Sequence, residues 1–131
     1  MTTTENPASK PELIQPRGPY SSAIQSGNII YLSGQGGLDS TGQMVAGGIT
    51  AETKQTLANI EANLKACGAG LGNLVNATCF LTDIGDLEAF NSAWRDYFGE
   101  VRSPARTTVA VASLPFGLNL EISCQAALEQ P

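Results

Sequence analysis

Apolar and polar residues alternate in two stretches of the second half of the chain, and this pattern predicts β-strands. Every second residue is apolar in residues 75–82 and again in residues 118–126. Successive side chains of a strand point to opposite faces, so each stretch has one face suited to the core. Glu121 falls among the polar positions of the second stretch. We therefore expect Glu121 to project away from the core.

Two other stretches have apolar residues at every third or fourth position, which is typical of amphipathic helices. The first begins after Thr50 as N-cap and ends at Gly68, and the second begins after Asp86 and ends at Gly99. The apolar residues of the second helix form one wide face, made of Leu87, Phe90, Trp94, Tyr97 and Phe98. We interpret this face as part of the core.

Shorter apolar and β-branched runs predict the remaining strands. Residues 28–33 and 107–112 have this composition, a further short strand is expected near Ala23, and a hairpin turn is expected at residues 39–42. The resulting order is β-β-α-β-α-β-β. It predicts an α+β domain with a mixed sheet and two helices on one face.

The other face of this sheet is expected to carry small and polar side chains, namely Thr108, Ala110, Asn119, Glu121 and Ser123. These side chains are too small for a well-solvated surface and too polar for a core. We therefore expect that face to lie inside an oligomer with a wet interior.

Length and charge narrow the class of protein. The chain has 131 residues, enough for one domain, and residues 1–16 contain three prolines. We expect residues 1–16 to form a flexible arm before a domain of residues 17–131. Seven Lys and Arg against twelve Asp and Glu give a net charge of −5. Nucleic-acid binding normally needs a basic surface, so nucleic acid is not an expected partner.

The chain contains no histidine, which excludes a Ser-His-Asp triad, a Cys-His pair and an HExxH zinc site. Cys67, Cys79 and Cys124 are widely spaced and match neither a zinc motif nor a disulfide framework. We expect them to be buried thiols in a reducing compartment, and we expect no metal. Neither a signal peptide nor a membrane span is recognisable, so a cytoplasmic protein without membrane contact is expected.

Three motifs have the composition of a ligand site. The glycines of residues 67–72 close a helix instead of opening one, so we interpret them as a helix-terminating loop and not as a phosphate site. Residues 33–37 leave a strand with little side-chain bulk, and either present backbone N–H groups to an oxyanion or form a plain loop. Arg106 has small neighbours and no acid nearby in sequence. It either binds a carboxylate or forms a structural ion pair.

Several segments together resemble the RidA (YjgF/YER057c/UK114) family. They are Gly18-Pro19-Tyr20, Tyr-Leu-Ser-Gly-Gln at residues 31–35, Phe90-Asn91-Ser92, Ser-Pro-Ala-Arg-Thr-Thr-Val at residues 103–109, and Leu-Pro through Leu-Glu-Ile at residues 114–122. The resemblance runs in register from about Gly18 to Ala127. The Pro-Ala-Arg and Leu-Glu-Ile strands at this spacing carry most of it.

The resemblance implies a chorismate-mutase-like (YjgF-type) protomer, a homotrimer with a barrel-like core, and ligand sites in clefts between subunits. It also implies hydrolysis of reactive enamines and imines, such as 2-aminoacrylate-type 2-imino acids, to 2-keto acids and ammonium, without metal or organic cofactor. Arg106 matches the family's carboxylate-binding arginine, and Glu121 matches the glutamate that positions the attacking water. Tyr20, Ser33 and Asn91 match further pocket positions, and Gly34, Thr108 and Phe116 are expected to line the pocket with them.

Three positions depart from the family pattern. Thr108 stands where members often carry cysteine, so a role that needs a thiol is not expected. Gly36-Gly37 replaces an apolar residue and proline, which is expected to loosen or reshape one pocket wall. Phe116-Gly117 replaces a polar pair, so the cleft is expected to be narrower or to favour a larger, flatter substrate.

Other functions would use the same residues. One is a pathway-specific deaminase of an unsaturated amino acid such as 2-aminomuconate. Another is a non-catalytic trimer that binds small carboxylates or acts as a chaperone, in which Glu121 would be dispensable. The ribonuclease activity attributed to some relatives fits less well with a net charge of −5.

Overall fold

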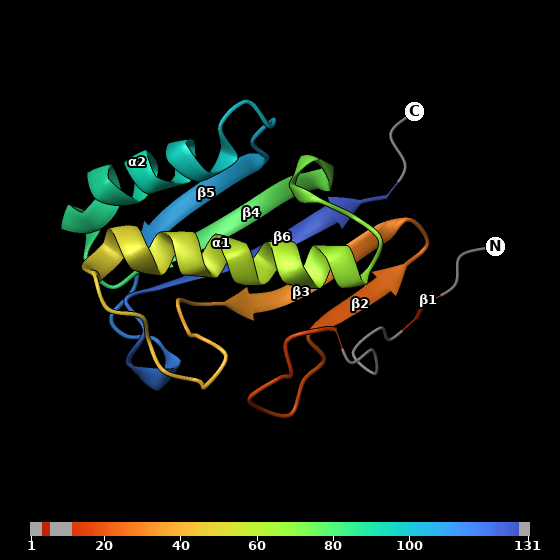
Figure 1. Cartoon of the computed structure of the whole chain (residues 1–131), viewed down its shortest axis with the longest axis horizontal. Coiled ribbons are helices and arrows are strands. Elements are labelled where there is room, and N and C mark those ends of the chain that lie inside the picture. The colour runs from red at the N-terminus through yellow and green to blue at the C-terminus, as the bar shows by residue number, and fades with distance from the viewer. Residues whose placement is uncertain (1–3, 6–11, 129–131) are drawn as a thin grey trace.

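A six-stranded mixed sheet forms the centre of the protein in the computed structural model, which describes residues 4–5 and 12–128 (Figure 1). The strands lie in the order β1 (Thr4–Glu5), β2 (Ala23–Ser26), β3 (Ile29–Gln35), β6 (Leu120–Ala127), β4 (Leu74–Leu81) and β5 (Ala105–Ala110). Only β4 and β5 pair in parallel; the other neighbours are antiparallel. The predicted mixed sheet is therefore confirmed, including a short strand at Ala23.

Two helices, α1 (Gly48–Ala66) and α2 (Leu87–Phe98), contact each other and cover one face of this sheet (Figure 1). Their buried side chains and those of the strands form one core cluster. Phe90 of α2, Leu57 of α1 and Ile122 of β6 are at most 1% exposed. Burying each such side chain contributes about 1.5–3 kcal/mol. Neither helix has the length and apolar character needed to cross a membrane, as far as the described residues go.

Helix ends were predicted with mixed success. The Thr50 N-cap is wrong: α1 begins at Gly48, after Gly47, and has no side-chain cap. The end at Gly68 is confirmed, because Gly68 has φ +79° and donates to the Lys65 carbonyl at 3.0 Å. Asp86 does precede α2, but its side chain makes no capping hydrogen bond. The preceding 3₁₀ turn, Ile84–Asp86, is capped by the Asp83 side chain.

Pairing between strands changes which side chains share a face. A register shift between Leu74 and Asn76 leaves Val75 38% exposed, although its alternation had placed it in the core. Thr108 pairs with Cys79, which is fully buried on the helix side of the sheet. Partners in a ladder point to the same face, so Thr108 also faces the helices. The sequence predicted that Thr108 and Ala110 would lie on the polar face with Glu121, and this prediction is wrong. Ala110 is two residues beyond Thr108 in the same strand, so it points to the helix side as well.

Residues before Arg17 also contact the domain where they are described. Leu13 is 3% exposed within the core, and the Ile14 N–H donates to Asn63 Oδ1 of α1 at 2.8 Å. The Ser22 hydroxyl donates to the Ile14 carbonyl at 2.5 Å. Residues 1–3 and 6–11 of the expected arm lie outside the described residues. The predicted turn at residues 39–42 is confirmed, with one bridge between Leu38 and Met44.

Candidate functional site

A cleft of about 840 Å³ lies beside β3 and β6. Its walls come from residues 14–22, from the loop after β3, from α1 and from the turn before β6. Five of the residues expected from the sequence lie in it, namely Tyr20, Ser33, Gly34, Phe116 and Glu121. Segments far apart along the chain thus meet at one cleft.

Glu121 lies on β6 against the backbone of Gly34 on β3. A Cβ atom added to Gly34 would lie 2.5 Å from Glu121 Oε2, a distance that no real side chain tolerates. Only glycine therefore allows the carboxylate to take this position. Burial raises the pKa of Glu121 above its ordinary value. A carboxylate with a raised pKa is a stronger base, which suits proton transfer near neutral pH.

Ser33 joins the wall of this cleft to the segment before β2. Its hydroxyl donates to the Ser21 carbonyl at 2.5 Å, and its N–H donates to the Ser22 carbonyl at 3.0 Å. Its oxygen can still accept a hydrogen bond. Tyr20 lies at the start of the same segment and is 48% exposed. Hydrogen bonds thus hold the backbone of this wall in place, while the ring of Tyr20 stays accessible to solvent.

The loop after β3 is fastened tightly. Asn59 of α1 donates to the Gly36 carbonyl at 3.0 Å and to the Leu38 carbonyl at 2.9 Å. A Cβ at Gly36 would lie 2.6 Å from the Leu118 side chain, and one at Gly37 would lie 2.9 Å from the α1 backbone. Of the two expected effects of these glycines, a reshaped pocket wall agrees with this geometry and a loosened one does not, because they let the loop approach α1 and Leu118 closely.

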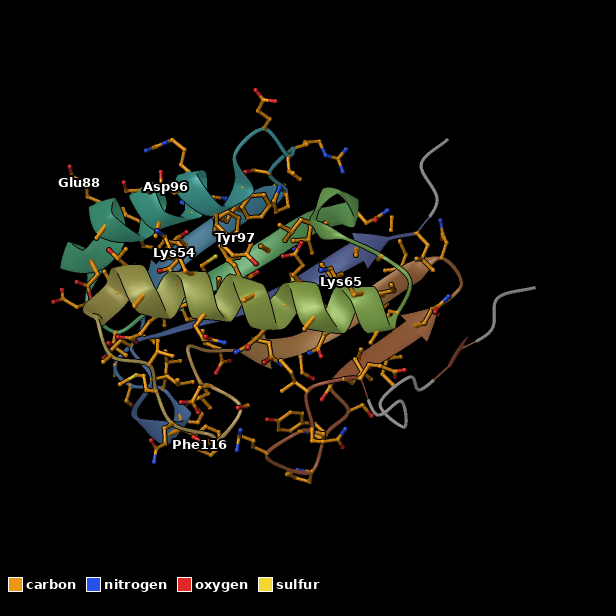
Figure 2. The ribbon with its side chains drawn as sticks, viewed as in Figure 1. Lys54, Lys65, Glu88, Asp96, Tyr97 and Phe116 are labelled. Atoms are coloured by element: carbon orange, nitrogen blue, oxygen red, sulfur yellow. The ribbon has the colours of Figure 1, made fainter. Side chains whose placement is uncertain are left out.

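Phe116 stands at the rim of the cleft, on the 3₁₀ turn Pro115–Gly117. Figure 2 shows it at the end of the molecule opposite α2, near the loop after β3. Its side chain is 60% exposed. The expectation that an aromatic residue borders the cleft therefore agrees with its position.

The second cavity, of about 400 Å³, lies between α2 and β5 and contains Arg106 and Asn91. The Arg106 guanidinium donates to Asn91 Oδ1 at 2.5 Å. It also lies over two rings of α2, with its Cζ 5.0 Å from the centroid of Phe90 and 4.9 Å from that of Trp94. Each cation–π contact contributes about 0.5–1 kcal/mol or more, depending on desolvation.

Among the described residues, Asn91 is the only one that accepts a hydrogen bond from the Arg106 side chain. A guanidinium has five N–H groups in a planar fork, so most of them have no partner in this part of the chain. Within the part of the chain that the structure describes, no carboxylate pairs with Arg106. The described residues therefore provide no structural ion pair for this arginine, and an unpaired fork is what a carboxylate ligand requires.

Arg106 and Glu121 do not meet within one chain. Arg106 pairs with Ala77, which is buried on the helix side of β4. Glu121 pairs with Phe80, whose neighbours Cys79 and Leu81 are buried on the helix side, so Phe80 and Glu121 point to the opposite face. The two residues best suited to catalysis thus line separate cavities, and their side chains point to opposite faces of one sheet.

The remaining sequence predictions concern Thr108 and the cysteines. Thr108 lines neither cavity; it lies beside the Cys79 thiol under α2. All three cysteines are free and buried, as predicted. Burial raises the pKa of Cys79 to about 11 and that of Cys124 to about 12, so both stay protonated and unreactive at neutral pH. Among the described residues, no three His, Cys, Asp or Glu side chains gather into a metal site.

Sequence reasoning missed the role of Phe90 and Trp94. Their helical spacing was interpreted as core, and both are indeed at most 5% exposed. They also border the guanidinium of Arg106, with the Trp94 indole N–H donating to the Ser103 hydroxyl at 3.2 Å. The only available signal was that Asn91, a predicted pocket residue, lies between them on the same helix.

The sequence of this chain is similar to those of known proteins. The sequence matches a family model described as endoribonuclease L-PSP over residues 10–128. A goat (Capra hircus) protein named 2-iminobutanoate/2-iminopropanoate deaminase is 46% identical over 110 residues, which is 83% of this chain and 80% of the goat protein.

Two solved structures have the same fold. The Rid-family protein YyfA of Yersinia pestis, described as of unknown function, has a TM-score of 0.87 at 35% identity, covering 95% of this chain and 99% of its own. TdcF of Escherichia coli, solved with bound serine, has a TM-score of 0.84 at 29% identity, covering 90% and 94%.

Proposed function

Because the chain belongs to the RidA (YjgF/YER057c/UK114) family, we propose that it hydrolyses reactive imines and enamines of 2-amino acids to 2-keto acids and ammonium. The observation that carries this proposal is the unpaired Arg106 fork together with the partly desolvated Glu121 carboxylate. The name of the goat relative describes the same chemistry. The bound serine in TdcF is a small molecule with the same carboxylate.

Arg106 binds the substrate carboxylate through its free N–H groups. Two parallel hydrogen bonds to a carboxylate fix both the position and the plane of the substrate. Asn91 and the two rings of α2 hold the guanidinium in place before substrate arrives. The binding energy is then used for orientation, which places the imine carbon for attack.

Glu121 acts as the base. An enamine first accepts a proton on its β-carbon and so becomes an iminium ion, which is the protonated form of the imine. Glu121 then takes a proton from water while the water oxygen bonds to the iminium carbon and the C=N electron pair moves onto nitrogen. In the resulting carbinolamine the protonated Glu121 returns its proton to the amino nitrogen; the hydroxyl proton then passes to solvent, the C=O bond forms, and the C–N bond breaks to release ammonia. One water enters and one ammonia leaves, so no cofactor is needed.

For Arg106 and Glu121 to act on the same substrate, a second protomer must bring them together. We propose a homotrimer with a barrel-like core, in which Arg106 of one protomer completes the Glu121 cleft of its neighbour. The face that carries Glu121 also exposes Tyr31 and Val109, at 49% and 40%, and such apolar side chains suit burial against another subunit. The free buried thiols suit a reducing compartment such as the cytoplasm.

The first experiment generates 2-imino acids in situ with an amino-acid oxidase, traps them with semicarbazide, and measures how much imine the protein diverts to keto acid. Diversion by the wild type and not by Arg106→Ala is the expected result. If no imine is diverted while keto acids still bind, the protein is a binding trimer. If only an unsaturated substrate such as 2-aminomuconate is turned over, it is a pathway-specific deaminase.

A second experiment tests the shared site. Arg106→Ala and Glu121→Gln chains are co-expressed so that they form mixed trimers. If each site takes Arg106 and Glu121 from different protomers, about a quarter of the sites regain both residues, and activity returns from two inactive variants. If each site belongs to one protomer, the mixed trimers stay inactive.

A further inference from the structure

The rim of the larger cleft contains an unusual backbone conformation. Phe116 has φ +61° and ψ +19°, and it is the only non-glycine residue with positive φ among the residues the structure describes. The next residue, Gly117, has φ +68°. A residue with a Cβ is disfavoured in this left-handed region, so Phe116 lowers the stability of the fold.

The fold gains little from phenylalanine at this position. The ring is 60% exposed, so it buries little apolar surface. The turn itself is closed by the backbone, where the Leu118 N–H donates to the Pro115 carbonyl at 3.2 Å. Asparagine or glycine would adopt the same conformation with less strain. Strain that the fold does not require is characteristic of functional positions.

The cleft below Phe116 has the size and surface of a site for an apolar group. Tyr20, a second aromatic residue at 48% exposure, lines the same cleft. Ile14, Leu38 and Leu118 add aliphatic walls. In the single protomer, before a neighbour completes it, the cleft has a volume of about 840 Å³, which is more than an alanine-derived imine would fill. Glu121 lies in this cleft as well, so the side chain of a substrate that reacts there would contact these walls.

We propose that Phe116 and Tyr20 bind the side chain of the substrate, and that the cleft selects 2-imino acids with aromatic or large apolar side chains. The inference rests on the proposed function, since the substrate is taken to react at Glu121. An aromatic side chain of the substrate would pack against the rings of Tyr20 and Phe116, either stacked or edge-to-face. It would cover apolar surface of these rings that is otherwise exposed to water.

One residue of the cleft favours a different substrate. Arg17 also lines it, and a Cβ at Gly42 would lie 2.6 Å from Arg17 Nη1, so the guanidinium rests on the turn at residues 39–42. An arginine at this place could instead bind a second carboxylate. The experiment therefore includes a glutamate-derived imine.

The test compares imines generated from phenylalanine, leucine, alanine and glutamate in the semicarbazide assay. The wild type is expected to have a kcat/KM about tenfold higher for the phenylalanine imine than for the alanine imine. In Phe116→Asn this ratio is expected to fall to about one, while the Tm rises by about 3 °C because asparagine tolerates the left-handed conformation. A loss of this substrate preference combined with a gain of stability separates ligand binding from a structural role.

Ile84→Asn is the matched control. Ile84 is an apolar residue of similar exposure, 53%, that lines neither cavity. The substrate ratio should therefore not change in this variant. Size-exclusion chromatography with light scattering is run on both variants to check the oligomeric state.

Three results would overturn the inference. The first is a wild-type preference for the alanine or glutamate imine. The second is an unchanged ratio in Phe116→Asn. The third is a lower Tm with loss of the oligomer in that variant, which would make Phe116 an assembly residue. If no imine is turned over at all, the proposed function fails, and calorimetric affinities for phenylpyruvate and pyruvate test the same ratio without turnover.

Discussion

Arg106 and Glu121 are held in opposite ways by the two cavities. Arg106 is surrounded by fixed contacts, a hydrogen bond to Asn91 and the rings of Phe90 and Trp94. Glu121 receives no hydrogen bond from any residue the structure describes. Its carboxylate occupies space that is available only because Gly34 has no side chain. A group that binds gains from being positioned in advance, because less entropy is lost on binding.

A group that moves protons has the opposite requirement. Hydrogen bonds to a carboxylate stabilise its charged form and lower its pKa, whereas burial without such bonds raises the pKa. Burial is the cause of the raised pKa of Glu121. One cavity therefore holds a rigid binding group, Arg106, and the other holds a base with a raised pKa, Glu121. Each of the following variants alters one of these two residues or its surroundings.

The largest effect is expected for Arg106→Ala. Removing the guanidinium deprives the substrate carboxylate of its charged partner, and kcat/KM should fall about a thousandfold. Two cation–π contacts are lost as well, so the free energy of unfolding should fall by about 1–2 kcal/mol, with the oligomer retained. Steady-state kinetics and light scattering test both statements. Activity close to wild type would contradict the carboxylate-binding role.

Glu121→Gln should lower kcat about a hundredfold and leave KM nearly unchanged. Glutamine keeps the size of the side chain and removes only the base. The acidic limb of the wild-type pH profile of kcat/KM, caused by protonation of Glu121 in the free enzyme, should lie above the ordinary pKa of a glutamate because burial raises the pKa of this group. The limb should be missing in the variant. A higher KM with unchanged kcat would reverse the assigned role.

Gly34→Ala should lower kcat about tenfold by displacing the Glu121 carboxylate. The added methyl group would meet the mobile end of the Glu121 side chain, with Oε2 at 2.5 Å and Cδ at 2.8 Å. The side chain can rotate away at little cost in stability, so the Tm should change by less than about 3 °C. If the Tm falls sharply, the close approach is structural and not catalytic.

Trp94→Leu should raise KM about fivefold with little change in kcat, since it loosens the guanidinium without removing it. Trp94→Phe keeps a ring under Arg106 and should have a smaller effect. Tyr97→Phe is the control on the same helix: it removes the hydrogen bond to Glu61 but touches no part of the Arg106 cavity. Equal KM values in the leucine and phenylalanine variants would show that the rings do not position Arg106.

The smallest effect concerns stability. Because the pKa of Glu121 is raised in the folded state, its stabilising contribution is fully present below the unfolded pKa and is lost as the pH rises through the folded pKa. Glu121→Gln should therefore melt slightly higher than the wild type at neutral pH, and the difference should vanish near pH 4. Thermal melts over this range measure it. A variant less stable than the wild type at neutral pH would contradict the sign.

The repeating patterns of the sequence determined most of the fold. Alternation in β6 placed Glu121 on the face opposite the core, and helical periodicity located α1 and α2, with Gly68 at the end of α1. Such patterns work because side-chain direction in a strand or helix is set by the backbone geometry of a few neighbouring residues. The resemblance to the RidA family also indicated Arg106 as the carboxylate-binding residue, and this role stays a prediction.

Only the tertiary structure decided which residues share a face or a cavity. Val75 became exposed through a register shift with β6, and Thr108 turned toward the helices through its pairing with Cys79. The rings around Arg106 come from a helix that precedes it in the chain, and Glu121 lies on the other side of the sheet. Strand register and helix-to-sheet contacts depend on residues far apart in sequence, so no local pattern can encode them.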